Sequence, residues 1–394
     1  MEQVRYGIVG IGNQGTAYAY EFFMKKQVDN AVLTAICDID PRKIDLFKER
    51  NVEGVEYFTD YKEMIDSGKI DAVLVETPHY LHPEISIYAL THGVHALCDK
   101  PAGVYTKQVK EMNEVAKKSD RLFGMMFNQR ANCLYRKMRE IIVSGQIGKI
   151  FRVNWIITNW FRSQKYYDSG SWRATWKGEG GGVLINQCPH QLDLVSYVTG
   201  MQPKTVNAFV KYGRFHKIEV EDEVTAYFEY ENGATGVFIT TTGEAPGTNR
   251  FEVSGTKGKI LCEKNKLYLT TNEEDLEDFT ANTDKFFGAP KATTIEVETD
   301  GINLQHVAIA RNFTNAILGK EELYVSGEEG INGVELMNAI ELSGWKNGKT
   351  VSIPVDEKEY LKKLNKLCKK SILKEVGEVA VADTSGTYGS KITK

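Results

Sequence analysis

Residues 1–128 alternate short apolar runs with stretches of helical spacing. Five of these runs are apolar enough for buried strands, and they cover residues 4–9, 31–40, 71–78, 95–101 and 122–128. Strands that alternate with helices favour a parallel sheet that carries helices on both faces. The pattern therefore predicts an α/β domain over residues 1–128.

The pattern changes after a helix near residues 134–143. Strand-like runs then follow one another, with one helix at about 181–198 between them, and the runs cover residues 151–161, 205–213, 224–233, 235–243, 250–258 and 266–272. Strands in sequence without helices between them favour antiparallel pairing. Two further helices are expected at 304–318 and 333–343. Residues 129–394 are therefore predicted to form an α+β domain with a large, mainly antiparallel open sheet and a C-terminal arm.

Composition and charge exclude several classes of protein. The 394-residue chain has a formal net charge of −4, so neither nucleic acid nor an anionic membrane is an expected partner. The chain has no apolar run of the roughly 18 residues that a membrane helix needs, and it begins without a signal-peptide pattern, so we expect a cytoplasmic protein. An open sheet of the predicted size must be covered, which predicts a homo-oligomer, either a dimer or a tetramer.

Cysteine and histidine spacing argue against bridges and metal sites. The six cysteines include no C-x-x-C pair and are expected as buried apolar side chains. The pairs His79/His82 and His92/His95 have no cysteine or carboxylate companions at ligand spacing, so no metal site is expected.

A glycine-rich segment follows the first predicted strand and opens a helix. Gly10, Gly12 and Gly15 have G-x-G-x-x-G spacing, with Asn13 and Gln14 before the last glycine. In this spacing the first glycine permits a tight turn, the second lets the backbone approach a pyrophosphate, and the third allows close packing of the helix on the strand. A structural turn can have the same spacing, but the strand–turn–helix context favours a dinucleotide. We therefore predict a Rossmann fold.

An acid at the end of the second predicted strand favours NAD over NADP. Asp38 can accept hydrogen bonds from both adenosine ribose hydroxyls and would repel a 2′-phosphate. Asp40 could take the same part, and Arg42 keeps NADP open because a guanidinium can pair with a phosphate. The expected cofactor is NAD, which could be tightly bound.

Residues 77–101 resemble a segment of the glucose–fructose oxidoreductase, inositol dehydrogenase and MocA (Gfo/Idh/MocA) family. They contain Thr77-Pro78, a histidine four residues beyond the proline, and Asp99-Lys100-Pro101 where the family usually has Glu-Lys-Pro. Residues 181–194 and 348–356 resemble a later helix and the C-terminal strand of the family. The resemblance implies an NAD-dependent sugar oxidoreductase, and it implies cofactor contacts from Thr77, Pro78, His82, Asp99, Lys100 and Asn128.

The catalytic pair is implied by the same resemblance. In the inositol-dehydrogenase pattern a lysine and a histidine flank the substrate hydroxyl, which here gives Lys100 and His190, while the family's D-x-x-x-H aspartate is replaced by Asn186. A reference pKa of about 6.5 suits His190 as the general base, with Lys100 donating to the developing alkoxide, and the two roles could be exchanged. Asn186 is expected to orient the substrate. Asp193, one turn beyond His190, either contacts substrate or supports packing.

Residues 160–176 are rich in tryptophan, tyrosine and arginine. Aromatic planes and guanidinium forks complement the C–H faces and polar edges of a sugar ring, although aromatic residues here could equally be core. We expect substrate contacts from Trp160, Arg162, Tyr167 and Trp172. Arg173 could instead reach the cofactor pyrophosphate.

The resemblance is greatest to family members that oxidise glycosides or sugars at C3. The expected activity is therefore reversible, NAD-dependent oxidation of a secondary ring hydroxyl to a keto-sugar. Two alternatives stay open: transient oxidation that assists glycosidic cleavage or elimination, and a sensing regulator without catalysis. The catalytic pair argues against the regulator, because a sensor needs no acid–base pair.

Overall fold

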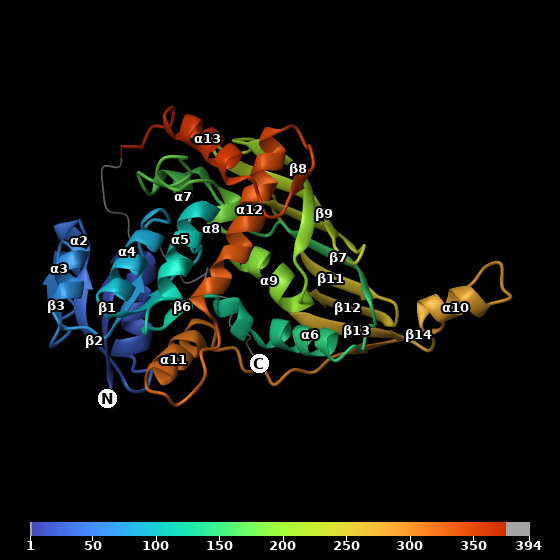
Figure 1. Ribbon diagram of the computed structural model, residues 1–394, viewed down its shortest axis with the longest axis horizontal. Helices are drawn as coiled ribbons and strands as arrows, with labels where there is room; N and C mark the ends of the chain where they lie inside the picture. Colours follow the sequence, from blue (N-terminus) through green and yellow to red (C-terminus); the bar gives the residue numbers. More distant parts are fainter. Residues whose placement is uncertain (1, 376–394) are drawn as a thin grey trace.

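The computed structural model describes residues 2–375, which fold around two sheets (Figure 1). The first sheet has six strands in the order β3-β2-β1-β4-β5-β6, and every neighbouring pair is parallel. Its strands are β1 (Val4–Val9), β2 (Ala31–Cys37), β3 (Glu56–Phe58), β4 (Ala72–Val75), β5 (His95–Cys98) and β6 (Phe123–Met125). This is the strand order of a Rossmann fold, so the predicted α/β class is confirmed.

Burial explains which of these strands the sequence revealed. All residues of β4 and β5 are buried, as expected of strands covered on both faces. The edge strand β3 was not predicted, because one of its three residues is exposed, the other two are only partly buried, and they form no apolar run. The helices around this sheet are α1 (Asn13–Tyr18), η1 (Ala19–Met24), α2 (Pro41–Lys48), α3 (Tyr61–Asp66), α4 (Leu81–Thr91) and α5 (Thr106–Ala116).

The second sheet has nine strands in the order β14-β13-β12-β11-β7-β10-β9-β8-β15. Only its β7–β10 pair is parallel, so the prediction of a mainly antiparallel sheet is confirmed. The strands are β7 (Ile150–Ile157), β8 (Pro203–Tyr212), β9 (Glu221–Tyr230), β10 (Thr235–Thr241), β11 (Asn249–Gly255), β12 (Gly258–Glu263), β13 (Lys266–Asn272), β14 (Ala292–Glu296) and β15 (Val351–Ser352). Strands β12 and β14 were not predicted.

Helices cover one face of this second sheet, where α6, α9 and α12 pack against one another and on the strands (Figure 1). The helices of this half are η2 (Asn128–Ala131), α6 (Cys133–Val143), α7 (Gln164–Asp168), α8 (Val183–Asn186), α9 (Pro189–Thr199), α10 (Leu276–Asn282), α11 (His306–Ile317), η3 (Gly327–Glu329), α12 (Gly330–Trp345) and α13 (Glu357–Cys368). The single helix predicted at 181–198 is two helices. Pro189 lacks an N–H and begins the second of them.

Helix α11 returns from the second half of the chain to pack on the first sheet. The hydroxyl groups of Tyr6 and Thr314 lie 2.8 Å apart, and Phe313 is fully buried against Gly124 of β6. The nucleotide-binding half is therefore completed by residues far beyond position 128.

The remaining expectations concern cysteines, membranes and the C-terminus. All six cysteines are free and five are buried, as predicted. Among residues 2–375 no helix is both long and apolar enough to cross a membrane. The predicted C-terminal arm begins with α13, and its last part, residues 376–394, lies outside the described residues.

Candidate active site between the two sheets

The glycine loop leaves open the space that a pyrophosphate needs. Gly10 has φ +96°, and a Cβ there would lie 2.5 Å from the carbonyl oxygen of Glu76. A Cβ on Gly15 would lie 2.0 Å from the carbonyl oxygen of Gly10, whereas a Cβ on Gly12 would meet no atom within 4 Å. The first and last glycines are therefore required by packing, and the middle one keeps the backbone open at the start of α1, where Asn13 and Gln14 follow.

Asp38 lies directly after β2, buried beneath the glycine loop. Its Oδ2 accepts a hydrogen bond from the backbone N–H of Ile11 at 2.9 Å, and the Lys43 ammonium lies 3.2 Å away. Asp40 instead caps α2 and pairs with Arg42 at 2.7 Å. Asp38 and Asp40 are the two acids that the sequence left as alternatives. Asp38 is the one at the glycine loop, because Asp40 is engaged with Arg42.

Two further acids follow the neighbouring strands β4 and β5. Burial and the nearby negative charge of Asp99 raise the pKa of Glu76 well above its ordinary value. The Oγ1 of Thr77 is buried and has no hydrogen-bond partner among residues 2–375. The sequence reading missed Glu76, although an acid immediately after a buried strand was the signal used for Asp38. These groups lie at the carboxyl ends of the parallel strands, where Rossmann folds bind their ligands.

His82, a predicted cofactor contact, lies between the loops that follow β4 and β5. Its side chain is buried, and its two ring nitrogens lie 2.7 Å from the carbonyl oxygens of Pro101 and Thr77. Both nitrogens are occupied by backbone, so His82 joins the loops after β4 and β5. The predicted cofactor contact of His82 stays a prediction.

Lys100 and His190 come from separate halves of the chain and lie within electrostatic reach of each other. The Lys100 Nζ donates to the carbonyl oxygen of Asn186 at 2.9 Å, one turn of chain before His190. Burial, followed by the positive charges of Lys100 and His306, lowers the pKa of His190 well below its ordinary value. The Nδ1 of His190 is buried without a hydrogen-bond partner among residues 2–375. The pair thus combines an ammonium with a neutral imidazole that has an unused nitrogen.

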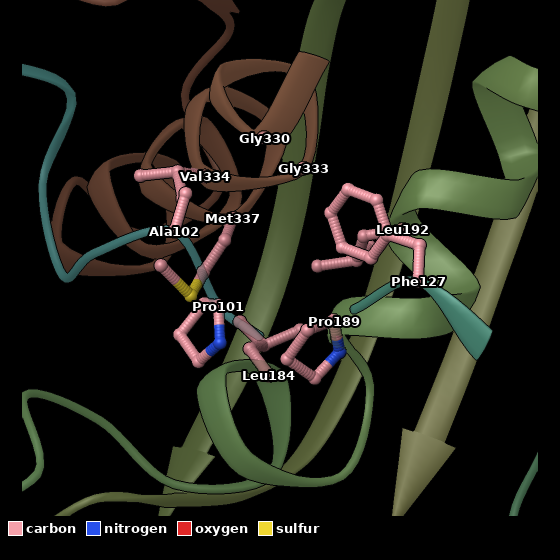
Figure 2. Close-up of a pocket in the computed structure, with 10 residues that line it drawn as sticks. All are labelled: Pro101, Ala102, Phe127, Leu184, Pro189, Leu192, Gly330, Gly333, Val334 and Met337. Atoms are coloured by element: carbon pink, nitrogen blue, oxygen red, sulfur yellow. The ribbon is translucent and has the colours of Figure 1, made fainter. Parts of the chain in front are cut away.

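Figure 2 shows an apolar cavity lined by residues next to Lys100 and His190 in the chain. Pro101, which follows Lys100, and Pro189, which precedes His190, line one small cavity. The other lining residues are Ala102, Phe127, Leu184, Leu192, Gly330, Gly333, Val334 and Met337. The free volume is about 10 Å³, room for about one water, so this cavity is no sugar site. It does show that the segments that carry Lys100 and His190 line a common apolar cavity.

A polar network surrounds Asn186. Its Oδ1 accepts from the Tyr166 hydroxyl at 3.1 Å and from the Gln187 amide at 2.8 Å. The same tyrosine hydroxyl accepts from the Arg173 guanidinium at 2.6 Å. Asn186 therefore has protein partners for the amide that was expected to face the substrate, and Arg173 lies with this network. The predicted substrate contact of Asn186 and the predicted pyrophosphate contact of Arg173 stay predictions.

Aromatic rings and guanidinium groups interleave beside the network. Arg162 lies over the rings of Trp160 and Tyr166, at 5.6 and 5.1 Å, and Arg173 lies over Tyr166 and Trp172, at 4.4 and 4.7 Å. The Nε atoms of Trp160 (Nε1), Arg162 and Arg173 are buried without hydrogen-bond partners among residues 2–375. The cluster thus presents flat apolar faces together with unused N–H donors, the combination that a sugar ring matches.

Comparison with known proteins places this geometry in a family. The model of the oxidoreductase family with an NAD-binding Rossmann fold matches residues 4–127, and that of the GFO/IDH/MocA C-terminal domain matches residues 135–261. The chain belongs to the Gfo/Idh/MocA family. It is an NAD-binding oxidoreductase, as the sequence predicted.

Relatives and solved structures agree with the assignment to the Gfo/Idh/MocA family. Myo-inositol 2-dehydrogenase of Thermotoga maritima is 27% identical, over 69% of this chain and 80% of its own. Levoglucosan dehydrogenase of Pseudarthrobacter phenanthrenivorans is 28% identical, over 66% of this chain and 74% of its own. The WlbA dehydrogenase of Chromobacterium violaceum, crystallised with NADH and UDP-GlcNAcA, superimposes with a TM-score of 0.77 at 26% identity and covers 90% of this chain and 97% of its own.

Two residues of this Gfo/Idh/MocA chain do not take the substrate-binding places predicted for them. Tyr167 is buried, and its hydroxyl donates to the Oγ1 of Thr242 at 2.7 Å. Asp193 is buried too, and its two oxygens accept from the Arg130 guanidinium at 2.6 and 2.8 Å. Both side chains are already satisfied inside the protein, so both predictions are corrected. The neighbouring Tyr166, which lies in the same aromatic stretch, is the tyrosine that hydrogen-bonds to Asn186.

Asn128, a predicted cofactor contact, is hydrogen-bonded to the residue that precedes α11. Its Nδ2 donates to the Oε1 of Gln305 at 2.9 Å, and its Oδ1 is buried without a partner among residues 2–375. Burial lowers the pKa of the adjacent His306 to about 4. Within the same residues, no group of three or more His, Cys, Asp and Glu side chains is arranged to hold a metal ion.

Proposed function

We propose that this protein oxidises a secondary ring hydroxyl of a sugar or glycoside, at C3, to the keto-sugar. The observation that carries the proposal is the contact of Lys100, from the first half of the chain, with Asn186 just before His190, beside the aromatic and guanidinium cluster, together with the electrostatic influence of Lys100 on His190. The relatives named above support the substrate class, because inositol and levoglucosan are ring polyols. The C3 position rests on the sequence resemblance alone.

His190 and Lys100 would have different roles in the removal of the hydroxyl proton. Oxidation of a carbinol requires removal of its hydroxyl proton as hydride leaves the carbon. His190 is kept neutral by burial, so its imidazole can take that proton. The ammonium of Lys100, which already donates to a carbonyl oxygen, can donate to the alkoxide that develops. Because the lowered pKa also makes the imidazole a weaker base, the exchanged roles stay open.

The nucleotide half fits NAD, which would supply the hydride acceptor. The open backbone at Gly12 would hold the pyrophosphate, and Asp38 would hold the adenosine ribose. Thr77 and Asp99, at the ends of β4 and β5, would contact the part of the cofactor nearest Lys100. On the other side, Trp160, Arg162, Tyr166 and Trp172 would hold the ring of the substrate.

The direct test is an absorbance scan at nicotinamide wavelengths. Purified protein with NAD is mixed with methyl α- and β-D-glucosides, free glucose and myo-inositol, and formation of NADH is followed. We expect NADH with at least one sugar, and its loss in Lys100→Met and His190→Ala with the fold intact. Wild-type turnover in either variant would overturn the assignment.

The same assay separates the alternatives. Release of aglycone from an aryl glucoside without net NADH would favour the transient oxidation that assists cleavage. Binding of a glucoside with neither NADH nor aglycone would favour a regulator.

We further propose that a second copy of this chain covers the outer face of the nine-stranded sheet. Phe209 of β8 is 64% exposed and Tyr227 of β9 is 38% exposed, and their strands are paired neighbours with both side chains on the outward face. Val237, Ile239 and Ile156 continue this face on β10 and β7 and are only partly buried. Light scattering should give a dimer or tetramer, and Phe209→Asp should give a smaller species. A wild-type monomer would contradict the proposal.

A further inference from the structure

A buried glutamate lies against Asn186, in the loop between α7 and α8. Glu179 is 1% exposed, and its Oε2 accepts from the backbone N–H of Ala174 at 2.5 Å. Its Oε1 accepts from the Nδ2 of Asn186. The loop sequence Gly-Glu-Gly-Gly-Gly gave no sign of this contact, because glycine-rich segments read as flexible connections.

The hydrogen bonds around Asn186 all run in one direction. The Arg173 guanidinium donates to the hydroxyl of Tyr166, which donates to the Oδ1 of Asn186. The Nδ2 of Asn186 then donates to Glu179, whose other oxygen accepts from a backbone N–H. Each oxygen of Glu179 thus faces a donor, which is the arrangement that suits an ionised carboxylate.

Opposing influences act on the carboxyl group of Glu179, and its pKa is raised overall because burial is the largest of them. Burial raises its pKa, and the positive charges of Arg173 and Lys100, with the hydrogen bonds from Ala174 and Asn186, act in the opposite direction. The titratable groups that face it from the packed elements are Lys100 after β5, His79 after β4, Arg173 after α7, Tyr167 of α7, and Lys374 after α13. The cationic groups that act on this carboxyl group are Arg173 and Lys100.

We propose that Glu179 is a positioning residue that supplies, through Asn186, the negative charge that the family's D-x-x-x-H pattern carries at position 186. The amide of Asn186 keeps the shape of the aspartate and fixes the network, and the carboxylate seven residues earlier provides the charge. Glu179 itself contacts neither Lys100 nor His190 by a hydrogen bond among the described contacts; its effect on the ammonium of Lys100 is electrostatic. The inference rests on the proposed dehydrogenase function.

Relocation of the charge tests this inference. Glu179→Gln removes the carboxylate and keeps the side-chain length, Asn186→Asp adds a carboxylate at the family position, and the double variant E179Q/N186D moves the charge from one place to the other. Glu335→Gln is the matched control, because Glu335 is partly buried on α12 and, among residues 2–375, accepts a hydrogen bond only from the backbone N–H of Val355. Glu179→Asn, which is smaller, takes the place of E179Q if the glutamine variant fails to fold.

The first readout needs no substrate. Competitive acetylation with acetic anhydride, followed by mass spectrometry of the peptide that contains Lys100, measures how its amine gains reactivity as the pH rises. Removal of a nearby carboxylate disfavours the ammonium form, so E179Q should reach half-maximal labelling about one pH unit lower. E179Q/N186D should return to the wild-type profile, and E335Q should match wild type. An unchanged profile in E179Q, or a folded double variant that stays shifted, overturns the inference.

The second readout is the pH dependence of kcat/KM with the methyl glucoside that wild type oxidises. We expect E179Q to lose about tenfold or more and to move the alkaline limb to lower pH by a similar shift, with both effects reversed in the double variant. A loss that the double variant does not reverse indicates a merely structural role and contradicts the inference. If wild type forms no NADH, the proposed function fails, and the acetylation profiles still decide whether Glu179 sets the charge at Lys100.

Discussion

The glycine loop at residues 10–15 offers its backbone from a single short segment, whereas the half of the site around Lys100 and His190 is assembled from five places in the chain. Lys100 follows β5, Asn186 and His190 lie on α8 and α9, Tyr166 lies on α7, and Glu179 lies in the loop between α7 and α8. The nucleotide half depends on local backbone geometry. The half around Lys100 and His190 depends on side-chain contacts within residues 166–186 and on the contact that Lys100 makes with Asn186 from the other half of the chain.

The largest expected effect is on kcat, and it should leave cofactor affinity unchanged. His190→Ala should lower kcat by about 10²- to 10⁴-fold, because it removes the group that takes the hydroxyl proton. NAD affinity, measured by fluorescence titration of NADH, should change little, since His190 belongs to the substrate half. A matching loss of NADH affinity would show that the two halves are not independent.

A second prediction concerns stability and compares a buried ion pair of α9 with an exposed ion pair of α6. Asp193 lies one turn beyond His190 on α9 and pairs with Arg130, both side chains being at most 3% exposed. Asp193→Asn leaves that guanidinium buried beside Glu329 alone, so the free energy of unfolding should fall by about 3 kcal/mol in urea denaturation. Glu140→Gln breaks the exposed pair with Lys137 and should cost less than about 0.5 kcal/mol. Equal losses in the two variants would contradict this reading.

A third prediction uses pH. Burial lowers the pKa of both His95, in the first sheet, and His306, beside the catalytic pair, to about 4. The unfolded chain, with a histidine pKa of about 6.5, takes up these protons first as the pH falls, so stability should decrease from about pH 6.5 down to pH 4.

Each of these histidines contributes a slope of up to about 1.4 kcal/mol per pH unit. His95→Asn keeps an acceptor for the N–H of Leu122 and should flatten the profile measured by urea titration. An unchanged slope in that variant would show that His95 is not buried in its neutral form.

The smallest expected effect concerns cofactor choice. Asp38→Ala should weaken NAD binding by about tenfold, because it removes the acceptor for the ribose hydroxyls, and should admit NADP beside Lys43. The ratio of NAD to NADP affinity, measured by isothermal titration, checks it. A native preference for NADP would contradict the role of Asp38 as the discriminating acid.

The sequence predicted what depends on neighbouring residues. The glycine spacing, the acid after β2 and the buried runs of β4 and β5 are local signals, and the structure confirms the fold that they indicate. The sequence could not predict the hydrogen-bond and ion-pair partners that folding brings together from distant parts of the chain. Spacing put Asp193 one turn beyond His190 on the same helix, but Arg130, 63 residues earlier, pairs with its carboxylate.

The same reason explains the other differences. Tyr166 and Tyr167 are adjacent on one short helix, and only the fold shows that the first faces Asn186 and the second faces Thr242. His82 fits a family motif, yet its partners are two backbone carbonyls that the sequence does not identify. Glu179 was missed because its loop has no pattern that separates a buried acid from a solvated one.

The central claim is that Lys100 and His190 act together on one carbinol, at C3 of the ring, beside bound NAD. Mass spectrometry of the NADH formed from a glucoside that carries deuterium at C3 tests it most directly. We predict that the deuterium appears in the NADH and that the rate falls relative to the unlabelled glucoside. Formation of unlabelled NADH would place the oxidation at another carbon and contradict the account.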